Sequence, residues 1–279
     1  MNTSDSAAPI AAAIQLSSVA DRDANLASAE KLLRQAAAAG VALAVLPENF
    51  AFMGAKERDK LAIAEADGQG PIQDFLSSMA RELKLWIVAG TVPLAVPGDA
   101  DKVYAACLVY CPLGRRVARY DKIHLFDVEV PGGERYRESA TIARGGINPV
   151  VVQTPIGKLG LSVCYDLRFP ELYRALAAQG AEALCVPAAF TARTGQAHWE
   201  SLLRARAIEN QCFLIAPGQH GTHAGGRSTH GHSLILDPWG EILAQQAAGD
   251  GVVAAPLPRE RLQQVRSSFP ALTHRRMGV

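Results

Sequence analysis

Cys164 is the residue in this sequence that is best placed to form a covalent bond with a substrate. It follows an apolar run, residues 159–163, that is typical of a buried strand, and a short polar turn separates it from a helix that begins near Pro170 and stops at Gly180. This order resembles the sharp bend that presents the nucleophile of many hydrolases. A helix N-terminus stabilises a nearby thiolate, so we expect the pKa of Cys164 to be lowered.

The residue type alone leaves a structural role open. Cysteine is among the most frequently buried residues, so a cysteine that ends an apolar strand can simply belong to the core. We interpret the other four as structural because they lie within apolar runs or hairpins: Cys107, Cys111, Cys185 and Cys212.

A carboxylate and a lysine stand out as partners for such a nucleophile. A cysteine nucleophile needs a base for its proton and a cation or N–H donors for the oxyanion. None of the seven histidines stands beside a strand end, whereas Glu48 directly follows Pro47 after the apolar run 41–46, and Lys122 ends a predicted hairpin strand. Taken in isolation, Glu48 could be a helix cap or a surface carboxylate, and Lys122 a solvated surface lysine.

The histidines do not predict a metal centre. His230 and His232 flank a single glycine, but no third ligand stands at a spacing that is familiar from metal sites. We therefore predict no metal, and the role of His230 stays open.

Alternating strands and helices must position these residues. Apolar runs predict strands at 10–16, 41–46, 85–89, 159–163 and 212–216, and hairpins at 103–120 and 233–243. Apolar periodicity predicts helices at 24–39, 72–83, 170–179 and 199–210, the first of them capped by Asp23.

The second half of the chain repeats the first. Segments 40–50 and 180–190 carry Gly, Pro and Phe at the same three positions, and a helix, a strand and a hairpin follow in both halves. Near-continuous apolar strands are typical of sheets that are covered on both faces. We therefore predict an α/β protein, a four-layer α-β-β-α sandwich with two pseudo-symmetric halves.

We expect this sandwich to form a single domain over residues 1–279, with a core of about residues 10–253 and a C-terminal tail of residues 254–279. Ligands of α/β sheets bind at the carboxyl ends of strands. This rule places Glu48 and Cys164 at one rim of a shared cleft.

The composition is that of a soluble globular protein. The chain has 279 residues, of which 49% are hydrophobic, and a formal net charge of +1. These values indicate no nucleic-acid partner and no membrane surface, and no apolar run reaches the length of a membrane-spanning helix. Five cysteines without paired spacing, in a chain in which we recognise no secretion signal, predict a cytoplasmic location.

Three motifs together resemble those of the nitrilase superfamily of carbon–nitrogen hydrolases. They are PENF at 47–50, YDKIHL at 120–125 and CYDLRFPE at 164–171, they occur in the family's order, and the similarity covers roughly residues 10–253. The resemblance implies a Glu48–Lys122–Cys164 triad in which Glu48 is the general base. Lys122 and the backbone N–H of Tyr165 would hold the oxyanion.

The resemblance has further implications for the site and the assembly. The family carries a second glutamate in the loop after the lysine, for which Glu138 is the best match and Glu129 and Glu134 are rivals. It also implies hydrolysis of a small-molecule amide through a thioester, with no cofactor, by a homodimer or a higher homo-oligomer.

Within the superfamily, four segments are most similar to the branch of amidases that act on deaminated glutathione: 124–132, 197–209, 237–240 and 274–276. Such an enzyme releases 2-oxoglutarate and Cys-Gly from an amide that is anionic at both ends. The nearest alternative is an ω-amidase acting on 2-oxoglutaramate or another small linear amide. A non-catalytic interaction protein on the same fold is a more distant one.

This branch implies substrate contacts for four residues: Tyr165, Arg168, Phe190 and Thr194. Arg168 would bind a substrate carboxylate in a bidentate manner. Structural alternatives remain for two of the four, since Arg168 could pair with Asp166 or Glu171, and Phe190 could belong to the core.

Overall fold

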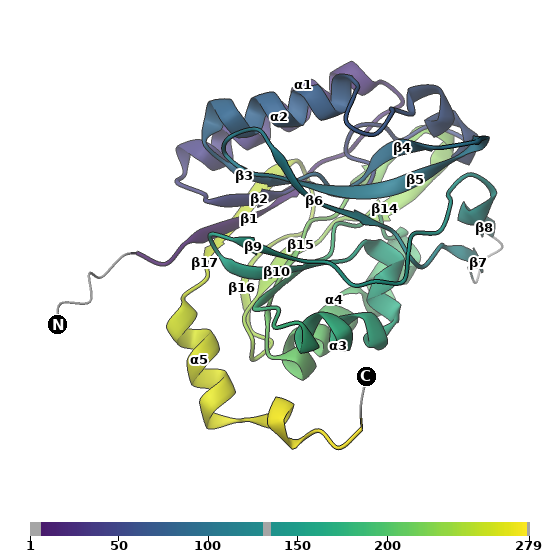
Figure 1. Cartoon of the computed structure of the whole chain (residues 1–279). Helices are drawn as coiled ribbons and strands as arrows, with labels where there is room; N and C mark the ends of the chain where they lie inside the picture. The colour runs from purple at the N-terminus through teal and green to yellow at the C-terminus, as the bar shows by residue number, and fades with distance from the viewer. Residues whose placement is uncertain (1–6, 131–134, 278–279) are drawn as a thin grey trace.

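The computed structural model describes residues 7–130 and 135–277. In it, two β-sheets are stacked face to face, and helices lie on their outer sides (Figure 1). The first sheet has the order β17-β1-β2-β3-β5-β4, and β6 also pairs with β5. Its strands are β1 (Ile10–Gln15), β2 (Leu43–Val45), β3 (Trp86–Val88), β4 (Val92–Val96), β5 (Asp99–Tyr110), β6 (Arg116–Asp121) and β17 (Gly251–Pro256).

The second sheet has the order β16-β15-β12-β11-β10-β9. Its strands are β9 (Val151–Thr154), β10 (Gly157–Leu161), β11 (Ala183–Cys185), β12 (Phe213–Ala216), β15 (Ser233–Leu236) and β16 (Ile242–Gln246). Two short ribbons lie outside these sheets and consist of β7 (Asp127–Glu129) with β8 (Arg135–Arg137), and β13 (His220–Thr222) with β14 (Ser228–His230).

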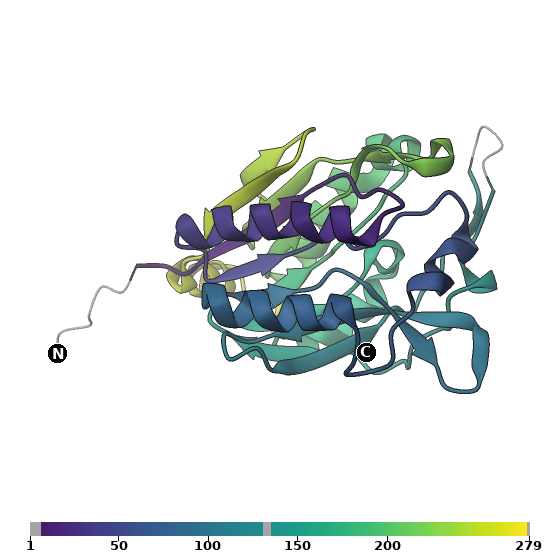
Figure 2. The same ribbon diagram turned by 90° about the horizontal axis from the view of Figure 1, so that it is seen from above.

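Helices cover the outer face of each sheet. In Figure 2, α1 and α2 lie side by side over the first sheet, and Figure 1 shows α3 and α4 beyond the second. The α-helices are α1 (Arg22–Ala38), α2 (Pro71–Leu83), α3 (Pro170–Ala178), α4 (Ala192–Asn210) and α5 (Arg259–Ser268). Short 3₁₀ helices span Glu57–Ile63, Glu138–Ala140, Cys164–Arg168, Ala224–Gly226 and Ala271–His274. The predicted four-layer α-β-β-α sandwich is confirmed.

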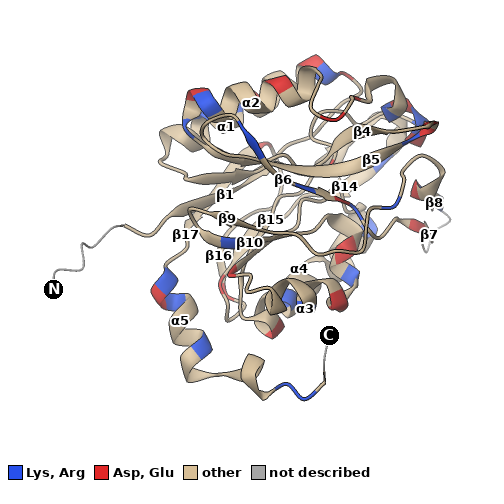
Figure 3. Cartoon of the chain, in the orientation of Figure 1, with Lys and Arg blue, Asp and Glu red and all other residues tan. Residues whose placement is uncertain are grey.

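Side-chain alternation along β1 explains the layers. Successive residues of a strand point to opposite faces. Ala11 and Ala13 pack into the cluster that the two sheets share, whereas Ala12 and Ile14 pack into the cluster beneath α1 and α2. Figure 3 shows charges of both signs dispersed over the helices, while the strands between the layers are mostly uncharged. None of the described helices is long and apolar enough to cross a membrane.

The repeated segments 40–50 and 180–190 supply equivalent strands, β2 and β11. Each is the middle one of three parallel strands, β1-β2-β3 in the first sheet and β10-β11-β12 in the second. The third strand of each set is followed by an antiparallel neighbour, β5 or β15. The predicted pseudo-symmetry of the two halves is therefore confirmed at the level of strand order.

Two predicted helix starts were wrong. Asp21, not Asp23, caps α1, because its side chain accepts a 3.0 Å hydrogen bond from the Ala24 N–H. Helix α4 begins at Ala192, seven residues before the predicted start at Trp199. Its first two turns are small and polar, so they carry no apolar periodicity that the sequence could show.

The C-terminal region takes part in the core. β17 runs through the predicted core boundary at residue 253 and pairs with β1 along its whole length. Beyond it, Leu262 and Val265 of α5 are also buried. The segment 254–279 is thus partly integrated into the sandwich.

Candidate active site

Glu48, Lys122, Glu138 and Cys164 lie together in one pocket. Glu48 follows β2 and Cys164 follows β10, so both stand at the carboxyl ends of central parallel strands, where the sequence placed them. The pocket opens to the surface, and its empty space, with the solvent at its mouth included, is about 470 Å³.

Close backbone packing and two N–H donors position Glu48. A Cβ atom on Gly90 would lie 1.9 Å from the Pro47 carbonyl oxygen, so only glycine allows β3 to end against the segment that carries the carboxylate. The Glu48 Oε2 accepts a 2.9 Å hydrogen bond from the Ala189 N–H. Gln219 donates to the Glu48 backbone oxygen at 3.0 Å. Glu48 is only 4% exposed, so its carboxylate has a fixed position and little contact with solvent.

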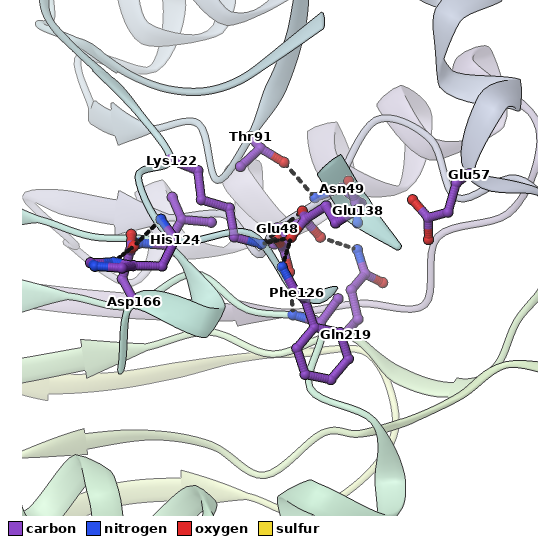
Figure 4. A network of polar contacts seen from close by, with 12 residues as sticks. Glu48, Asn49, Glu57, Thr91, Lys122, His124, Phe126, Glu138, Asp166 and Gln219 are labelled. Atoms are coloured by element: carbon purple, nitrogen blue, oxygen red, sulfur yellow. Dashed lines mark hydrogen bonds and ion pairs between the residues drawn. The ribbon is translucent and has the colours of Figure 1, made fainter. Parts of the chain in front are cut away.

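Lys122 is a buried cation held between two carboxylates (Figure 4). Its Nζ lies 2.8 Å from Glu48 Oε1, and 2.8 and 2.9 Å from the two oxygens of Glu138. Glu138 also accepts a 2.6 Å hydrogen bond from the Phe126 N–H, which holds it toward the lysine. A surface role for Lys122 is thereby excluded, since the residue is 1% exposed.

Of the three rival glutamates, Glu138 is the one that the structure places at Lys122. Glu129 forms an exposed ion pair with Arg135 at 3.3 Å. Glu134 lies outside the described residues.

Cys164 stands in a strained turn. Its φ is +48°, a left-handed conformation that costs a non-glycine residue free energy and occurs often at functional sites. The backbone N–H of Cys164 donates to the Pro187 oxygen at 2.9 Å. The 3₁₀ helix Cys164–Arg168 then separates the thiol from the N-terminus of α3 at Pro170.

The expected lowering of the Cys164 pKa is wrong. Burial raises the pKa of the thiol well above its usual range, and the negative charge of Glu48 raises it further, while Lys122 offsets part of this. The α3 N-terminus does not cap the thiol, because a full 3₁₀ helix lies between them. Cys164 therefore carries its proton at neutral pH and needs a base to become a nucleophile.

Glu48 has the ionisation state that such a base requires. Burial acts to raise its pKa, but the Lys122 charge and the contact with the Cys164 thiol hold the pKa below its ordinary value. Lys122 in turn stays protonated, because Glu138 and Glu48 raise its pKa despite the opposing effect of burial. The pocket can thus transfer a proton from the thiol to a carboxylate beside a permanent cation.

The four predicted substrate contacts all line the same pocket: Tyr165, Arg168, Phe190 and Thr194. The Arg168 guanidinium lies 5.4 Å from the Phe190 ring centroid and 5.8 Å from that of Tyr165. Its Nη1 is 3.2 Å from His198 Nδ1, and among the described residues it forms no ion pair with Asp166 or Glu171. Phe190 packs on Trp199 as well, so it belongs to both the core and the pocket.

Thr194 lies in the first turn of α4. Its backbone N–H donates to the Oγ1 of the N-cap residue Thr191 at 3.3 Å, and the two hydroxyls lie 2.8 Å apart. The helix start therefore fixes where this side chain borders the pocket.

Sequence reasoning missed one wall of the pocket. Glu57, Lys60 and Arg227 line it together with the predicted residues. Arg227 lies in a glycine-rich loop for which no role was predicted, and the 3₁₀ helix that carries Glu57 and Lys60 was not predicted. A single arginine that follows two glycines gives no indication of a functional role until the fold places it in the same pocket as Cys164.

The histidine pair lies apart from these residues. The His230 and His232 rings stack at 4.3 Å, and burial together with His232 lowers the pKa of His230 to about 4. His230 also packs on Gly195 of α4, where a Cβ atom would lie 2.3 Å from the His230 Cβ. Among the described residues no group of three or more His, Cys, Asp or Glu side chains is arranged to hold a metal ion.

Comparisons with known proteins cover almost the whole chain. Residues 10–267 match the family model described as carbon-nitrogen hydrolase. A Synechocystis sp. protein named deaminated glutathione amidase is 49% identical over 267 residues, 95% of this chain and 97% of that protein. A Homo sapiens protein of the same name is 41% identical over 270 residues, 96% of this chain and 82% of that protein.

A solved structure extends the likeness to the fold. The crystal structure of a Saccharomyces cerevisiae protein, described as a member of branch 10 of the nitrilase superfamily, matches with a TM-score of 0.86 at 30% identity and covers 98% of both chains. The family match includes every residue that meets in the pocket around Lys122.

Proposed function

Because this chain belongs to the carbon–nitrogen hydrolase family of the nitrilase superfamily, we propose that it is an amidase that hydrolyses deaminated glutathione to 2-oxoglutarate and Cys-Gly. The observation that carries the proposal is a buried thiol in one pocket with a buried carboxylate and a buried ammonium group that lie 2.8 Å apart. The names of relatives at 41% and 49% identity support the choice of substrate.

Glu48 starts the reaction as the general base. It accepts the Cys164 proton while the sulfur attacks the amide carbon, and the carbonyl electrons move to the oxygen. Lys122 has three N–H donors, of which one reaches Glu48 and one can serve both oxygens of Glu138. The remaining donor and the Tyr165 backbone N–H would stabilise the oxyanion.

Collapse of this intermediate breaks the carbon–nitrogen bond. The protonated Glu48 gives its proton to the leaving amine of Cys-Gly, which leaves a thioester on Cys164. Water then attacks the thioester carbon while Glu48 accepts a proton from the water. The carbon–sulfur bond breaks, Glu48 returns the proton to the Cys164 sulfur, and 2-oxoglutarate departs. Glu138 keeps Lys122 in place and charged throughout.

The charge of the pocket suits this substrate. Its lining contains four cationic side chains (Lys60, Lys122, Arg168 and Arg227) and three anionic ones (Glu48, Glu57 and Glu138). The excess of positive charge favours an anionic ligand. We assign Arg168 to the carboxylate of the 2-oxo acid, since it lies on the same turn as Cys164.

We also propose a homodimer or a higher homo-oligomer in the cytoplasm. An apolar surface patch supports the assembly: Trp239 and Phe269 are about half exposed and pack edge to face at 5.8 Å, and Ile208 lies against the neighbouring Gly240. All five cysteines are unpaired, as is usual in a reducing compartment. Light scattering of the purified protein tests the assembly, and a monomer at micromolar concentration would contradict it.

The test of the activity is 2-oxoglutarate release from deaminated glutathione and, in parallel, from 2-oxoglutaramate, by the wild type and by Cys164→Ala. We expect a preference for deaminated glutathione and no turnover in the variant. A preference for 2-oxoglutaramate would make the protein an ω-amidase with the same mechanism. Full activity in Cys164→Ala would overturn the nucleophile assignment.

A further inference from the structure

Arg227 is a pocket residue whose guanidinium is only partly satisfied by its contacts with the protein. Its Nη2 donates a 3.0 Å hydrogen bond to the Ala189 oxygen, and its Nη1 lies 3.7 Å from Glu57 Oε1. The guanidinium carbon lies 5.2 Å from the Tyr136 ring centroid. Arg227 Nε is shielded from solvent and has no hydrogen-bond partner among the described residues. A donor in that state costs free energy until an acceptor reaches it.

The loop that carries Arg227 is held in place on both sides. His223 is buried, with Nδ1 2.9 Å from the Ser18 oxygen and Nε2 2.7 Å from Thr229 Oγ1. A Cβ atom on Gly225 would lie 2.6 Å from the Ala55 oxygen, so the loop packs tightly against that segment. The guanidinium is thus preorganised, which reduces the entropy lost when a ligand binds.

The lysines that line the pocket are already engaged. Lys122 is bound by Glu48 and Glu138, and Lys60 donates to Glu57 at 2.9 Å. Because Glu57 pairs closely with Lys60, its contact with Arg227 is the longer and weaker one. With the last donor of Lys122 reserved for the oxyanion, the two arginines are the cations that remain for the substrate carboxylates.

Arg168 and Arg227 contact two consecutive residues of the pocket wall, Phe190 and Ala189. Arg168 lies over the Phe190 ring, and Arg227 binds the carbonyl of Ala189. Ala189 also donates its N–H to Glu48, so this wall borders the site of proton transfer. A substrate with an anion at each end can thus offer one carboxylate to each guanidinium of the same pocket.

We propose that Arg227 is a specificity-determining residue that binds the carboxylate of the leaving dipeptide. This inference rests on the proposed amidase function and deepens it. The acyl part of the substrate becomes bonded to Cys164, so its carboxylate belongs with Arg168 on the same turn. The leaving dipeptide forms no bond to Cys164, so its carboxylate requires a separate cation. The pocket would therefore select amides whose amine part ends in a carboxylate.

The experiment compares kcat/KM for three amides with the wild type, Arg227→Gln and Arg227→Lys. Deaminated glutathione has both carboxylates, 2-oxoglutaramate lacks the dipeptide, and deaminated glutathione with an amidated glycine end lacks only the second carboxylate. Arg227→Gln should lower kcat/KM for deaminated glutathione about 10- to 100-fold, mainly through KM, as expected for a lost charge-assisted hydrogen bond. In Arg227→Gln, the ratio of kcat/KM for deaminated glutathione to kcat/KM for each of the other two amides should fall at least about tenfold.

The other variants distinguish recognition of the substrate carboxylate by Arg227 from a purely structural role of Arg227 in holding Ala189 in place. Arg227→Lys keeps the charge and should retain part of the preference, and Arg168→Gln should lower kcat/KM for all three amides, since all carry the 2-oxo acid. Arg34→Gln, an exposed change on α1, serves as the control. An equal loss on all three amides in Arg227→Gln, or no loss, would overturn the inference, because a residue that only supports Ala189 does not distinguish them.

Failure of the underlying function gives a different result. If the wild type releases 2-oxoglutarate from neither natural amide, the proposed function falls and takes this inference with it. If it turns over deaminated glutathione and the ratios do not change in Arg227→Gln, the inference alone falls.

Discussion

The Tyr120 hydroxyl donates a 2.6 Å hydrogen bond to the carboxylate of Asp166, which is completely buried. The same carboxylate accepts hydrogen bonds from the backbone N–H of Val163 at 2.8 Å and of His124 at 3.1 Å. Two of these partners flank Lys122 and the third directly precedes Cys164. This carboxylate therefore sets the position of the lysine segment relative to the nucleophile turn.

Tyr120→Phe should weaken this connection. It removes one donor from a buried carboxylate, which typically lowers the free energy of unfolding by about 1–3 kcal/mol. Denaturant titration measures the change, and kcat should fall together with the stability because Lys122 and Cys164 lose a shared support. Tyr104→Phe is the matched control, since the Tyr104 hydroxyl has no hydrogen bond within the described residues. Equal stabilities of the two variants would contradict the role of Asp166.

Glu48→Gln should abolish turnover while the fold remains. The amide cannot accept the Cys164 proton, and loss of a general base typically costs roughly 100-fold or more in rate. The measurement is kcat, with circular dichroism and light scattering to check fold and assembly. A variant that keeps more than a tenth of the wild-type rate would rule Glu48 out as the base.

Lys122→Met should destabilise the protein strongly at neutral pH. It leaves the buried carboxylate of Glu48 and the partly buried one of Glu138 without their cation, and removal of one partner from a buried ion pair typically costs ~3–5 kcal/mol. Adding Glu138→Gln to the variant should recover part of this loss, because one uncompensated charge disappears. Lys31→Met on the exposed side of α1 is the control. Additive effects of the two site substitutions would show that the charges are not coupled.

The acid limb of kcat/KM should lie below pH 4.5. Lys122 and the Cys164 contact hold the pKa of Glu48 under its ordinary value of 4.5 despite burial, so the base stays ionised down to that pH. The ionised Glu48 carboxylate also stabilises the folded state above pH 4.5, and this contribution to stability is lost as pH falls through the folded-state pKa. A pH–rate profile from pH 3.5 to 8, with fold checked at each point, measures it. An acid limb centred above pH 5 would contradict the assignment.

Much of the site was predictable because local sequence carries its signals. Glu48 and Cys164 each follow an apolar run, and the repeat of segment 40–50 at 180–190 indicated that two such strands occupy equivalent places in stacked sheets. The motif around Lys122 identified the third residue through resemblance to a family. Each of these signals is contained in a few neighbouring residues.

The sequence by itself thus determined the four layers, the equivalence of the two halves and the segments that carry Glu48, Lys122 and Cys164, since hydrophobic periodicity and turn residues act over short distances. The tertiary structure decided the rest. It raised the pKa of Cys164 through burial and the charge of Glu48, although a local helix N-terminus suggested the opposite. It chose Glu138 over Glu129, and it brought Arg227 to the pocket. Charge and solvation depend on every atom that folding brings near, so no short segment of sequence contains them.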